Sequence, residues 1–298
     1  MSLSPNSLKA AAKQSMRAAA PPVFLVTLLF LALTDVLSEV VYAFTPVGTT
    51  NDPLQVLPLF LSILLLLFRI VMSFGYSSWA LQVAREEDVG IWGLLDGFGM
   101  VGRVLFLKFH TVIAMLGRMF FLSTAYVLLS MGILVVLPFL AGMILFLILT
   151  VAYALGLQVV EIQFSLVPFL LCDYPEEGSA RAVLRALQMT HGNLWSLIKL
   201  HLSFWPWYLL QILISVCAVS LSLSPALSQI NIFEITGDMT QIIGSLEYAL
   251  NSALSSSLVS LVSIPLLTFF LPYRSVSVAN FYRTLNGELS QAETPHSF

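Results

Sequence analysis

The sequence predicts an all-α fold, a polytopic membrane helix bundle with about six transmembrane helices and short cytosolic interfacial helices. Hydrophobic residues make up 58% of the 298 residues and charged residues only 10%, whereas about 25% of the residues of an average soluble domain are charged. The mean hydropathy is +0.91. Because one crossing needs about 20 apolar residues, the chain has room for about six crossings with short loops, and we expect no soluble domain.

We expect a single integral membrane domain over residues 1–298, made of an N-terminal amphipathic helix (1–22), a six-span bundle (23–285) and a polar C-terminal tail (286–298). The apolar runs that predict the spans are Val23–Phe44, Leu54–Val83, Leu105–Leu129, Ile133–Leu171, Leu194–Leu221 and Ala253–Tyr273. Several are longer than a bilayer requires, so they should tilt, kink or protrude. Proline should bend the fourth and sixth spans, at Pro138, Pro168, Pro265 and Pro272.

An amphipathic helix is predicted before the first span. Its basic residues recur every four positions, and a weakly apolar stripe runs beside them, before a Pro-Pro pair ends the helix. The basic residues are Lys9, Lys13 and Arg17, and the stripe is Leu8, Ala12, Met16 and Ala19. Such a helix should lie on the inner leaflet.

The segment between the second and third spans contains "GFGMVG", Gly97 to Gly102, which has the spacing of a dinucleotide-binding turn. That turn requires a strand before it, a helix after it and a surrounding βαβ unit. Here it lies between two membrane spans and follows the charged "REED" that starts at Arg85. We therefore interpret the glycines as breaks in a short interfacial helix.

A second amphipathic helix is predicted between the fourth and fifth spans, in "EEGSARAVLRALQMTHGN". Arg181 and Arg185 oppose Val183 and Leu187 on the helical wheel. Gly192 should stop this helix, and the asparagine after it should cap the next one. The helix is expected to anchor at the membrane interface, and the alternative is a regulatory helix that binds a partner.

The distribution of Lys and Arg predicts the orientation of the chain. With the N-terminus in the cytosol, all Lys and Arg residues except Arg69 and Arg118 fall on or near the cytosolic side: Lys9, Lys13, Arg17, Arg85, Arg103, Lys108, Arg181, Arg185, Lys199, Arg274 and Arg283. The loops of the other side carry acids instead: Asp52, Glu234, Asp238 and Glu247. By the positive-inside rule, the protein should lie in the cytoplasmic (inner) membrane with both termini cytosolic.

No constellation of catalytic or metal-binding residues is evident. The four histidines form no H-E-x-x-H pair, Cys172 and Cys217 form no C-x-x-C motif, and neither a G-x-S-x-G elbow nor a Walker loop occurs. The acidic "DYPEE" at Asp173 to Glu177 is a candidate site, and a turn with a helix cap explains it equally well. We expect no catalytic residues, no metal, no cofactor and no nucleic-acid partner.

Apart from the lysines near span entrances, five charged residues lie inside the predicted spans, namely Asp35 and Glu39 in the first, Arg69 in the second, Arg118 in the third and Glu161 in the fourth. Each would cost about 2.5 to 3.5 kcal/mol at mid-bilayer if it faced lipid. We therefore predict one buried cluster, in which Arg69 pairs with Asp35 or Glu39 and Arg118 pairs with Glu161. Such a cluster can bind a cation or proton, or it can only fix helix register.

Three blocks of the sequence resemble the domain-of-unknown-function family 975 (DUF975), multi-pass membrane proteins of mostly Gram-positive bacteria. They are "REEDVGIWGLLDGF", "FSLVPFLLCDYPEEGSARAVLRALQMTHGNLWSLIKLHLSFWPW" and "LPYRSVSVANFYRTL". The matching positions are Arg85, Gly97, Phe98, Asp173, Pro175, Gly192, Trp195, Ser203, Phe204, Trp207, Pro272, Tyr273, Phe281 and Tyr282. The resemblance implies the topology and location of the chain and supplies no reaction.

Two classes of function remain open from the sequence. The first is a non-enzymatic binding or transport module for an ion, a lipid or a small amphiphile within the bundle. The second is a membrane scaffold or regulatory protein that binds a partner through its cytosolic helices. A polar cavity within the bundle would favour the first, and an exposed apolar cytosolic patch the second.

Overall fold

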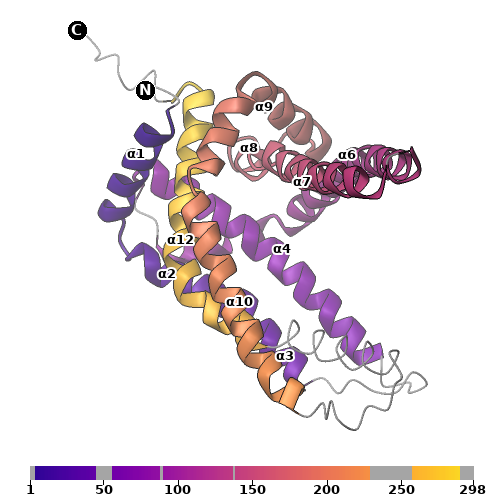
Figure 1. Cartoon of the computed structure of the whole chain (residues 1–298). Coiled ribbons are helices and arrows are strands. Elements are labelled where there is room, and N and C mark those ends of the chain that lie inside the picture. Colours follow the sequence, from indigo (N-terminus) through magenta and orange to yellow (C-terminus); the bar gives the residue numbers. More distant parts are fainter. Residues whose placement is uncertain (1–3, 45–55, 88–89, 137, 229–256, 289–298) are drawn as a thin grey trace. The chain divides into compact units, whose positions relative to one another are not determined.

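A computed structural model describes residues 4–44, 56–87, 90–136, 138–228 and 257–288 of the chain, and within them the regular structure is helical throughout, without a strand (Figure 1). This confirms the predicted all-α class. The chain divides into two compact units. Unit 1 comprises residues 1–20, 67–203 and 275–298, and unit 2 comprises residues 21–66 and 204–274. The prediction that residues 1–298 form one domain remains a prediction.

Within the described residues, five helices are long and apolar enough to cross a membrane, and a bent helix pair raises the number to six. These candidate spans are Val23–Val41, Leu59–Ala84, Val101–Val135, Phe139–Asp173 and Leu261–Leu285, with the pair Ser179–Leu202 and Trp205–Leu221. The first four agree with the predicted spans to within about six residues, whereas the fifth is divided between two helices and the sixth ends at Leu285, later than the predicted Tyr273. Some predicted features lie outside the described residues. They are the span starts at Leu54 and Ala253 and the acidic loop residues Asp52, Glu234, Asp238 and Glu247.

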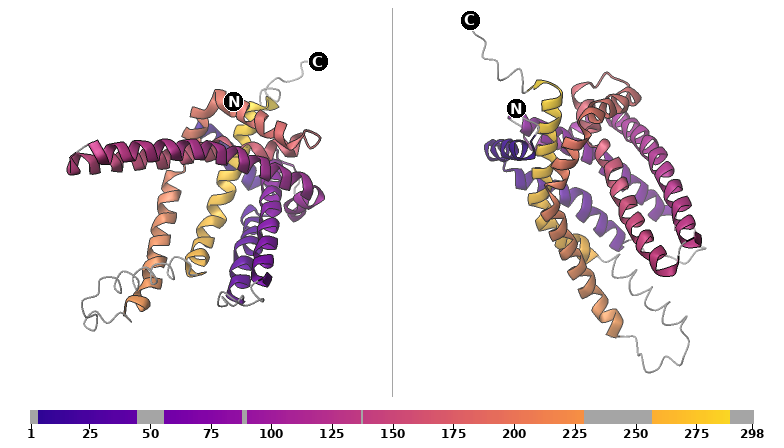
Figure 2. Two further views of the ribbon diagram at one scale, coloured as in Figure 1. Left: turned by 90° about the vertical axis from the view of Figure 1, so that its right-hand side faces the viewer. Right: turned by 45° about the horizontal axis from the view of Figure 1, so that its top comes forward.

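Unit 1 contains α1 (Pro5–Ala18), the later part of α4 (Val56–Ala84), the 3₁₀ helix η3 (Ile91–Leu95), α5 (Asp96–Gly99), α6 (Val101–Val136), α7 (Phe139–Gln163), α8 (Val167–Asp173), α9 (Ser179–Leu202) and the end of α12 (Ser257–Leu285). Helices α6 and α7 pack side by side as a hairpin (Figure 2). Helix α9 packs on both of them and also contacts α8 and α1. This three-helix arrangement forms the groove described below.

Unit 2 contains α2 (Val23–Leu31), the π-helical segment η1 (Ala32–Val36), α3 (Leu37–Phe44), the start of α4, α10 (Trp205–Ser228) and most of α12. Aromatic rings gather around Phe270 in this unit. Phe204, Trp207 and Tyr208 have their ring centroids within 5.9 Å of the Phe270 centroid, and Tyr273 lies edge-on to Phe204 at 5.2 Å. Such offset and edge-to-face pairs stabilise helix contacts beyond their buried area.

The predicted proline bends are found at only some of the four positions. Pro168 lies in the first turn of α8, just after α7 has ended at Gln163, so the fourth span is interrupted there. Pro265 and Pro272 lie inside α12, which continues through both. Pro138, in contrast, immediately precedes the first residue of α7. A proline is tolerated at the start of a helix because an N–H there would have no acceptor within the helix.

The predicted fifth span, Leu194–Leu221, is divided between two helices, α9 and α10. Asn193 leaves helical geometry (φ −126°, ψ 15°), as expected for the predicted boundary, but α9 continues past this kink to Leu202. The second helix of the pair starts at Trp205. Pro206 supplies the physical reason, since a proline lacks the N–H for a continuing helix and is favoured in a first turn.

Helix α1 buries part of its apolar stripe on the protein, and its predicted position on the inner leaflet stays a prediction. Leu8 and Ala12 are completely buried, and Ser15 is 5% exposed. Lys9 Nζ donates a hydrogen bond to the backbone oxygen of Ser203, at 2.6 Å, next to the end of α9. Periodicity alone does not say which apolar surface such a stripe meets.

The "GFGMVG" segment is helical, with a break at Met100 between α5 and α6, which agrees with a broken short helix before the third span. Its interfacial position stays a prediction. Helices η3 and α5 pack closely against α4. A Cβ atom on Gly75 would lie 1.9 Å from the carbonyl oxygen of Leu94, and one on Gly97 would lie 2.6 Å from that of Val71. The Asp96 carboxylate also accepts hydrogen bonds from side chains of α4. The glycines therefore permit backbone contact between the loop and α4.

We predict that Gly75→Ala destabilises the protein by about 1–3 kcal/mol, because its methyl group would overlap backbone atoms that cannot move independently. Thermal unfolding of the purified protein in detergent measures this effect. Gly99→Ala is the matched control, since no atom lies within 4 Å of a Cβ at that position. Equal unfolding temperatures for the two variants would contradict the close approach of α4 and η3.

Candidate functional site

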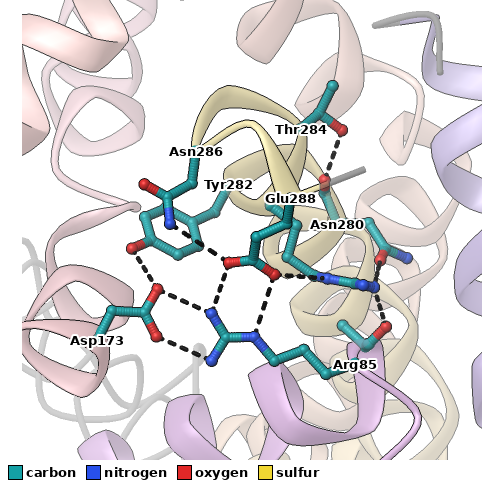
Figure 3. Close-up of polar contacts among 9 residues, drawn as sticks. Arg85, Asp173, Asn280, Tyr282, Thr284, Asn286 and Glu288 are labelled. Atoms are coloured by element: carbon teal, nitrogen blue, oxygen red, sulfur yellow. Dashed lines mark hydrogen bonds and ion pairs between the residues drawn. The ribbon is translucent and has the colours of Figure 1, made fainter. Parts of the chain in front are cut away.

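The ends of three helices in unit 1 meet at a cluster of charged and polar side chains, which we call the charge cluster (Figure 3). Its members are Arg85, Asp173, Asn280, Tyr282, Arg283, Asn286 and Glu288. Arg85 follows the last residue of α4, Asp173 ends α8, and the others belong to the end of α12 or the turn after it. The cluster therefore connects segments that are far apart in the sequence.

Arg85 is the centre of the charge cluster. Its Nη1 and Nη2 atoms each lie 2.8 Å from one Asp173 oxygen, and its Nη2 and Nε atoms donate to Glu288 at 2.6 and 3.2 Å. The Tyr282 hydroxyl donates to Asp173 at 2.7 Å. A planar guanidinium group can engage two carboxylates in this forked manner, whereas an ammonium group cannot.

The electrostatics of the cluster favour its charged state. Partial burial disfavours the charged form of Arg85, but the hydrogen bonds and charges of Glu288 and Asp173 outweigh it, and the pKa of Arg85 is raised. Burial would by itself raise the pKa of Glu288. The hydrogen bond and charge of Arg85, aided by Asn286 and Arg283, instead lower it from the ordinary value of 4.5.

The charge cluster unites three of the sequence-predicted family positions, Arg85, Asp173 and Tyr282. The "DYPEE" candidate therefore contributes its first acid to an ion pair. Glu177 of the same segment pairs with Arg185 at 2.6 Å, and Glu176 lies 3.5 Å from Arg103 at an exposed position. Glu288 was missed, because it lies in the predicted polar tail and nothing in its local sequence marks a partner.

Other predicted family positions serve packing or lie exposed. Gly97 permits the approach of α5 to α4, Phe98 contacts Phe68 with ring centroids 5.9 Å apart, and Phe281 is completely buried. Phe204, Trp207 and Tyr273 belong to the aromatic group of unit 2, Pro272 lies inside α12, and Pro175 lies in the turn after α8. Trp195 is 67% exposed, Gly192 is exposed in α9, and Ser203 bonds the Leu200 backbone oxygen.

The predicted pair of Arg118 and Glu161 is not formed. Arg118 instead donates a hydrogen bond to the side-chain oxygen of Gln163 and lies over the ring of Phe164, 5.1 Å from its centroid. Glu161 is exposed and has no ion pair among the described residues. Residues 161 and 163 are separated by about 200° around a helix, so only one of them faces α6.

The remaining members of the predicted intramembrane cluster lie in different units. Asp35 and Glu39 are half-buried in unit 2, where Asp35 lies within the π-helical segment η1. Arg69 belongs to unit 1 and is exposed. The pairing of Arg69 with Asp35 or Glu39 stays a prediction. In the part of the chain that the structure describes, no three Asp, Glu, His or Cys residues are grouped as metal ligands would be.

A groove of about 680 Å³ runs between α6, α7 and α9. Its lining residues are Arg118, Phe121, Leu122 and Ala125 from α6, Gly156, Val159, Val160 and Gln163 from α7, and Leu187, Thr190, His191 and Leu194 from α9. Most of this lining is apolar. Thr190 Oγ donates to the backbone oxygen of Gln163 at 3.4 Å, so Arg118, Gln163 and Thr190 form a polar end of the groove.

We predict that Arg85→Lys destabilises the protein by about 1.5–3 kcal/mol, because lysine cannot form the charge-assisted hydrogen bonds to both carboxylates. Thermal or denaturant unfolding in detergent measures the loss. Arg103→Lys is the control and should be nearly neutral, since its 3.5 Å contact with Glu176 is exposed. Equal losses in the two variants would mean that the cluster contributes no more than a surface ion pair.

The lowered pKa of Glu288 predicts a pH dependence. A carboxylate whose pKa is lower in the folded state stabilises the fold above the unfolded-state pKa and loses this contribution as the pH falls through the folded-state pKa. The melting temperature of the wild type should therefore fall from about pH 4.5 downward relative to that of Glu288→Gln. Plots of melting temperature against pH for the wild type and Glu288→Gln should converge as the pH falls. Plots that stay parallel would contradict a lowered pKa of Glu288 in the folded protein.

Comparison with known proteins gives one match. The family model described as "Protein of unknown function (DUF975)" matches residues 1–288 of the chain. No curated protein and no solved structure is significantly similar to the chain. Because the match covers nearly the whole sequence, including every block in which the resemblance was recognised, the chain belongs to the DUF975 family.

Proposed function

We propose that the protein is a non-enzymatic membrane protein that binds an anionic amphiphile, a fatty acid or an anionic lipid, in the groove between α6, α7 and α9. The observation that carries this proposal is the position of Arg118. It lies within the candidate span Val101–Val135, lines an otherwise mostly apolar groove, and has no carboxylate partner among the described residues. A ligand with an anionic head and an apolar tail matches both features.

The energetics favour such a ligand. An arginine in the middle of a membrane helix costs about 2.5–3.5 kcal/mol, and the neutral side chain of Gln163 compensates only part of a full charge. The C-terminal end of α7 also lies at Gln163, and its partial negative charge stabilises a cation. That dipole explains why Arg118 is tolerated. It does not explain the apolar groove beside it, which an acyl chain would fill.

The size of the groove agrees with this class of ligand. A volume of about 680 Å³ lies within the usual range for small-molecule sites, roughly 300–1,000 Å³. Gly156 contributes to it, because a Cβ at this position would lie 2.9 Å from the end of the Leu122 side chain. A larger residue there would fill the space between α6 and α7.

Location and orientation are part of the proposal. The excess of Lys and Arg on one side supports a cytoplasmic membrane protein with both termini in the cytosol. The second functional class, a scaffold or regulatory protein, is supported by exposed apolar residues between the second and third candidate spans, including Trp92 (78% exposed) and Phe98 (41%). Aromatic residues at that level are also typical of membrane interfaces, so this patch alone does not favour a protein partner.

We predict that Arg118→Gln weakens the binding of oleate to the purified protein about tenfold or more, because a charged hydrogen-bond partner contributes about 1.5–3 kcal/mol. Arg118→Lys retains the charge and should restore most of the affinity. Binding of oleate in detergent micelles, followed by native mass spectrometry or by displacement of a fluorescent fatty acid, measures the effect.

Lys108→Gln is the matched control, since Lys108 is an exposed cation of α6 that does not line the groove. Gly156→Leu tests the apolar part independently and should also reduce oleate binding by filling the groove. Unchanged binding in Arg118→Gln and in Gly156→Leu would overturn the proposal. The scaffold class would then be the better candidate.

A further inference from the structure

We propose, on the basis of the function proposed above, that the amphiphile in the groove carries a phosphate monoester as its head and that His191 helps to bind this head. The groove and the helices that form it, α6, α7 and α9, belong to unit 1. The polar end of the groove offers more hydrogen-bond donors than a carboxylate can use, and this excess favours a phosphate.

The three walls of the groove meet at Gln163. Its side-chain oxygen accepts a hydrogen bond from Arg118 of α6, and its backbone oxygen accepts one from Thr190 of α9 at 3.4 Å. His191 is the next residue of α9, so it lies only about 1.5 Å further along the helix axis, and it lines the same groove. Each wall therefore contributes a polar side chain near one level: Arg118, Gln163 and His191.

All three side chains have donors that the protein leaves unused. A guanidinium group has five N–H donors, and the hydrogen bond to Gln163 is the only one that Arg118 makes among the described residues. Because the Oε1 atom of Gln163 accepts this bond, its Nε2 atom remains a donor. Neither this atom nor the His191 ring has a hydrogen bond in the described part of the chain.

A carboxylate head would use only part of this set of donors. Its two oxygens can be satisfied by two parallel N–H groups of one guanidinium, so Arg118 alone could bind it. A phosphate monoester has three terminal oxygens and carries about −1.5 to −2 charges at pH 7. While Arg118 binds two of these oxygens, the third can accept from Gln163 Nε2 or from His191.

The charge of the lining also favours a strongly anionic head. Among the described residues that line the groove, Arg118 carries a formal positive charge and none is Asp or Glu. The lining is therefore net positive even when His191 is neutral. In a mostly apolar groove, a doubly charged head gains more from this cation than a singly charged head does.

Three amphiphiles with the same chain and different heads test the proposal: oleyl phosphate, oleate and oleyl alcohol. Each is titrated into the full-length protein in non-ionic detergent micelles, and displacement of a fluorescent fatty acid is measured against the mole fraction of the amphiphile in the micelle. Oleyl phosphate should bind about tenfold more tightly than oleate, since it adds a charged hydrogen bond, and oleyl alcohol should bind most weakly. Inorganic phosphate should displace nothing at the same concentrations, because it has no chain to bury against the apolar walls.

The variant His191→Ala tests the role of the imidazole. It should bind oleyl phosphate about tenfold more weakly than the wild type does and should bind oleate equally well, so that the preference for phosphate disappears. Because His191 is exposed, the substitution should leave folding intact. Gln188→Ala is the matched control and should retain the preference, since Gln188 is an exposed residue of α9 that does not line the groove.

The results distinguish the phosphate head from the proposed function itself. Equal affinities of the wild type for oleyl phosphate and oleate, an unchanged preference in His191→Ala, or displacement by inorganic phosphate would overturn the phosphate head. In each of these cases, weaker oleate binding by Arg118→Gln would still support the proposed function. If none of the three amphiphiles binds saturably, both the proposed function and the phosphate head are wrong.

Discussion

The forked engagement of one guanidinium group by two carboxylates is the interaction on which the organisation of unit 1 depends. Arg85 brings Asp173 of α8 and Glu288, after α12, to the end of α4, and Tyr282 completes the arrangement by bonding Asp173. The apolar surfaces of membrane helices provide little specificity, because lipid tails are as apolar as the side chains. Directional, charge-assisted hydrogen bonds at the helix ends can therefore set which helices meet and in what register.

The charge cluster and the mostly apolar groove occupy different parts of unit 1. The charge cluster lies where candidate spans end, so its charges need not enter the hydrocarbon layer. The groove lies at the α6–α7 hairpin, and its single cation is held by a carboxamide and an aromatic ring. Hydroxyls along the same hairpin bond each other across it, as Ser123 and Tyr153 do at 2.9 Å. Such contacts satisfy polar groups between helices where water is absent.

The helical class and the positions of most spans could be predicted from the sequence, because they depend on composition and on the spacing of apolar residues. Apolar runs located the spans, because a bilayer requires about 20 such residues whatever their neighbours, and glycine spacing located the break before α6. The neighbouring helix toward which each side chain points was less predictable. Arg118 and Glu161 were paired by depth alone, whereas rotation about α7 placed Gln163 toward α6. The later start of α10 at Trp205 was readable from Pro206 and was missed. The role of Glu288 in the charge cluster was not predictable, since Arg85 lies 203 residues away in the sequence.

The exposure of α6 determines how a ligand would reach the groove. None of the most apolar stretch of its candidate span, Val101–Val135, is buried inside the protein, so in a membrane this helix has lipid along its length. An amphiphile would then enter sideways from the surrounding leaflet, with its tail never leaving hydrocarbon. Occupancy would follow the mole fraction of that amphiphile in the bilayer.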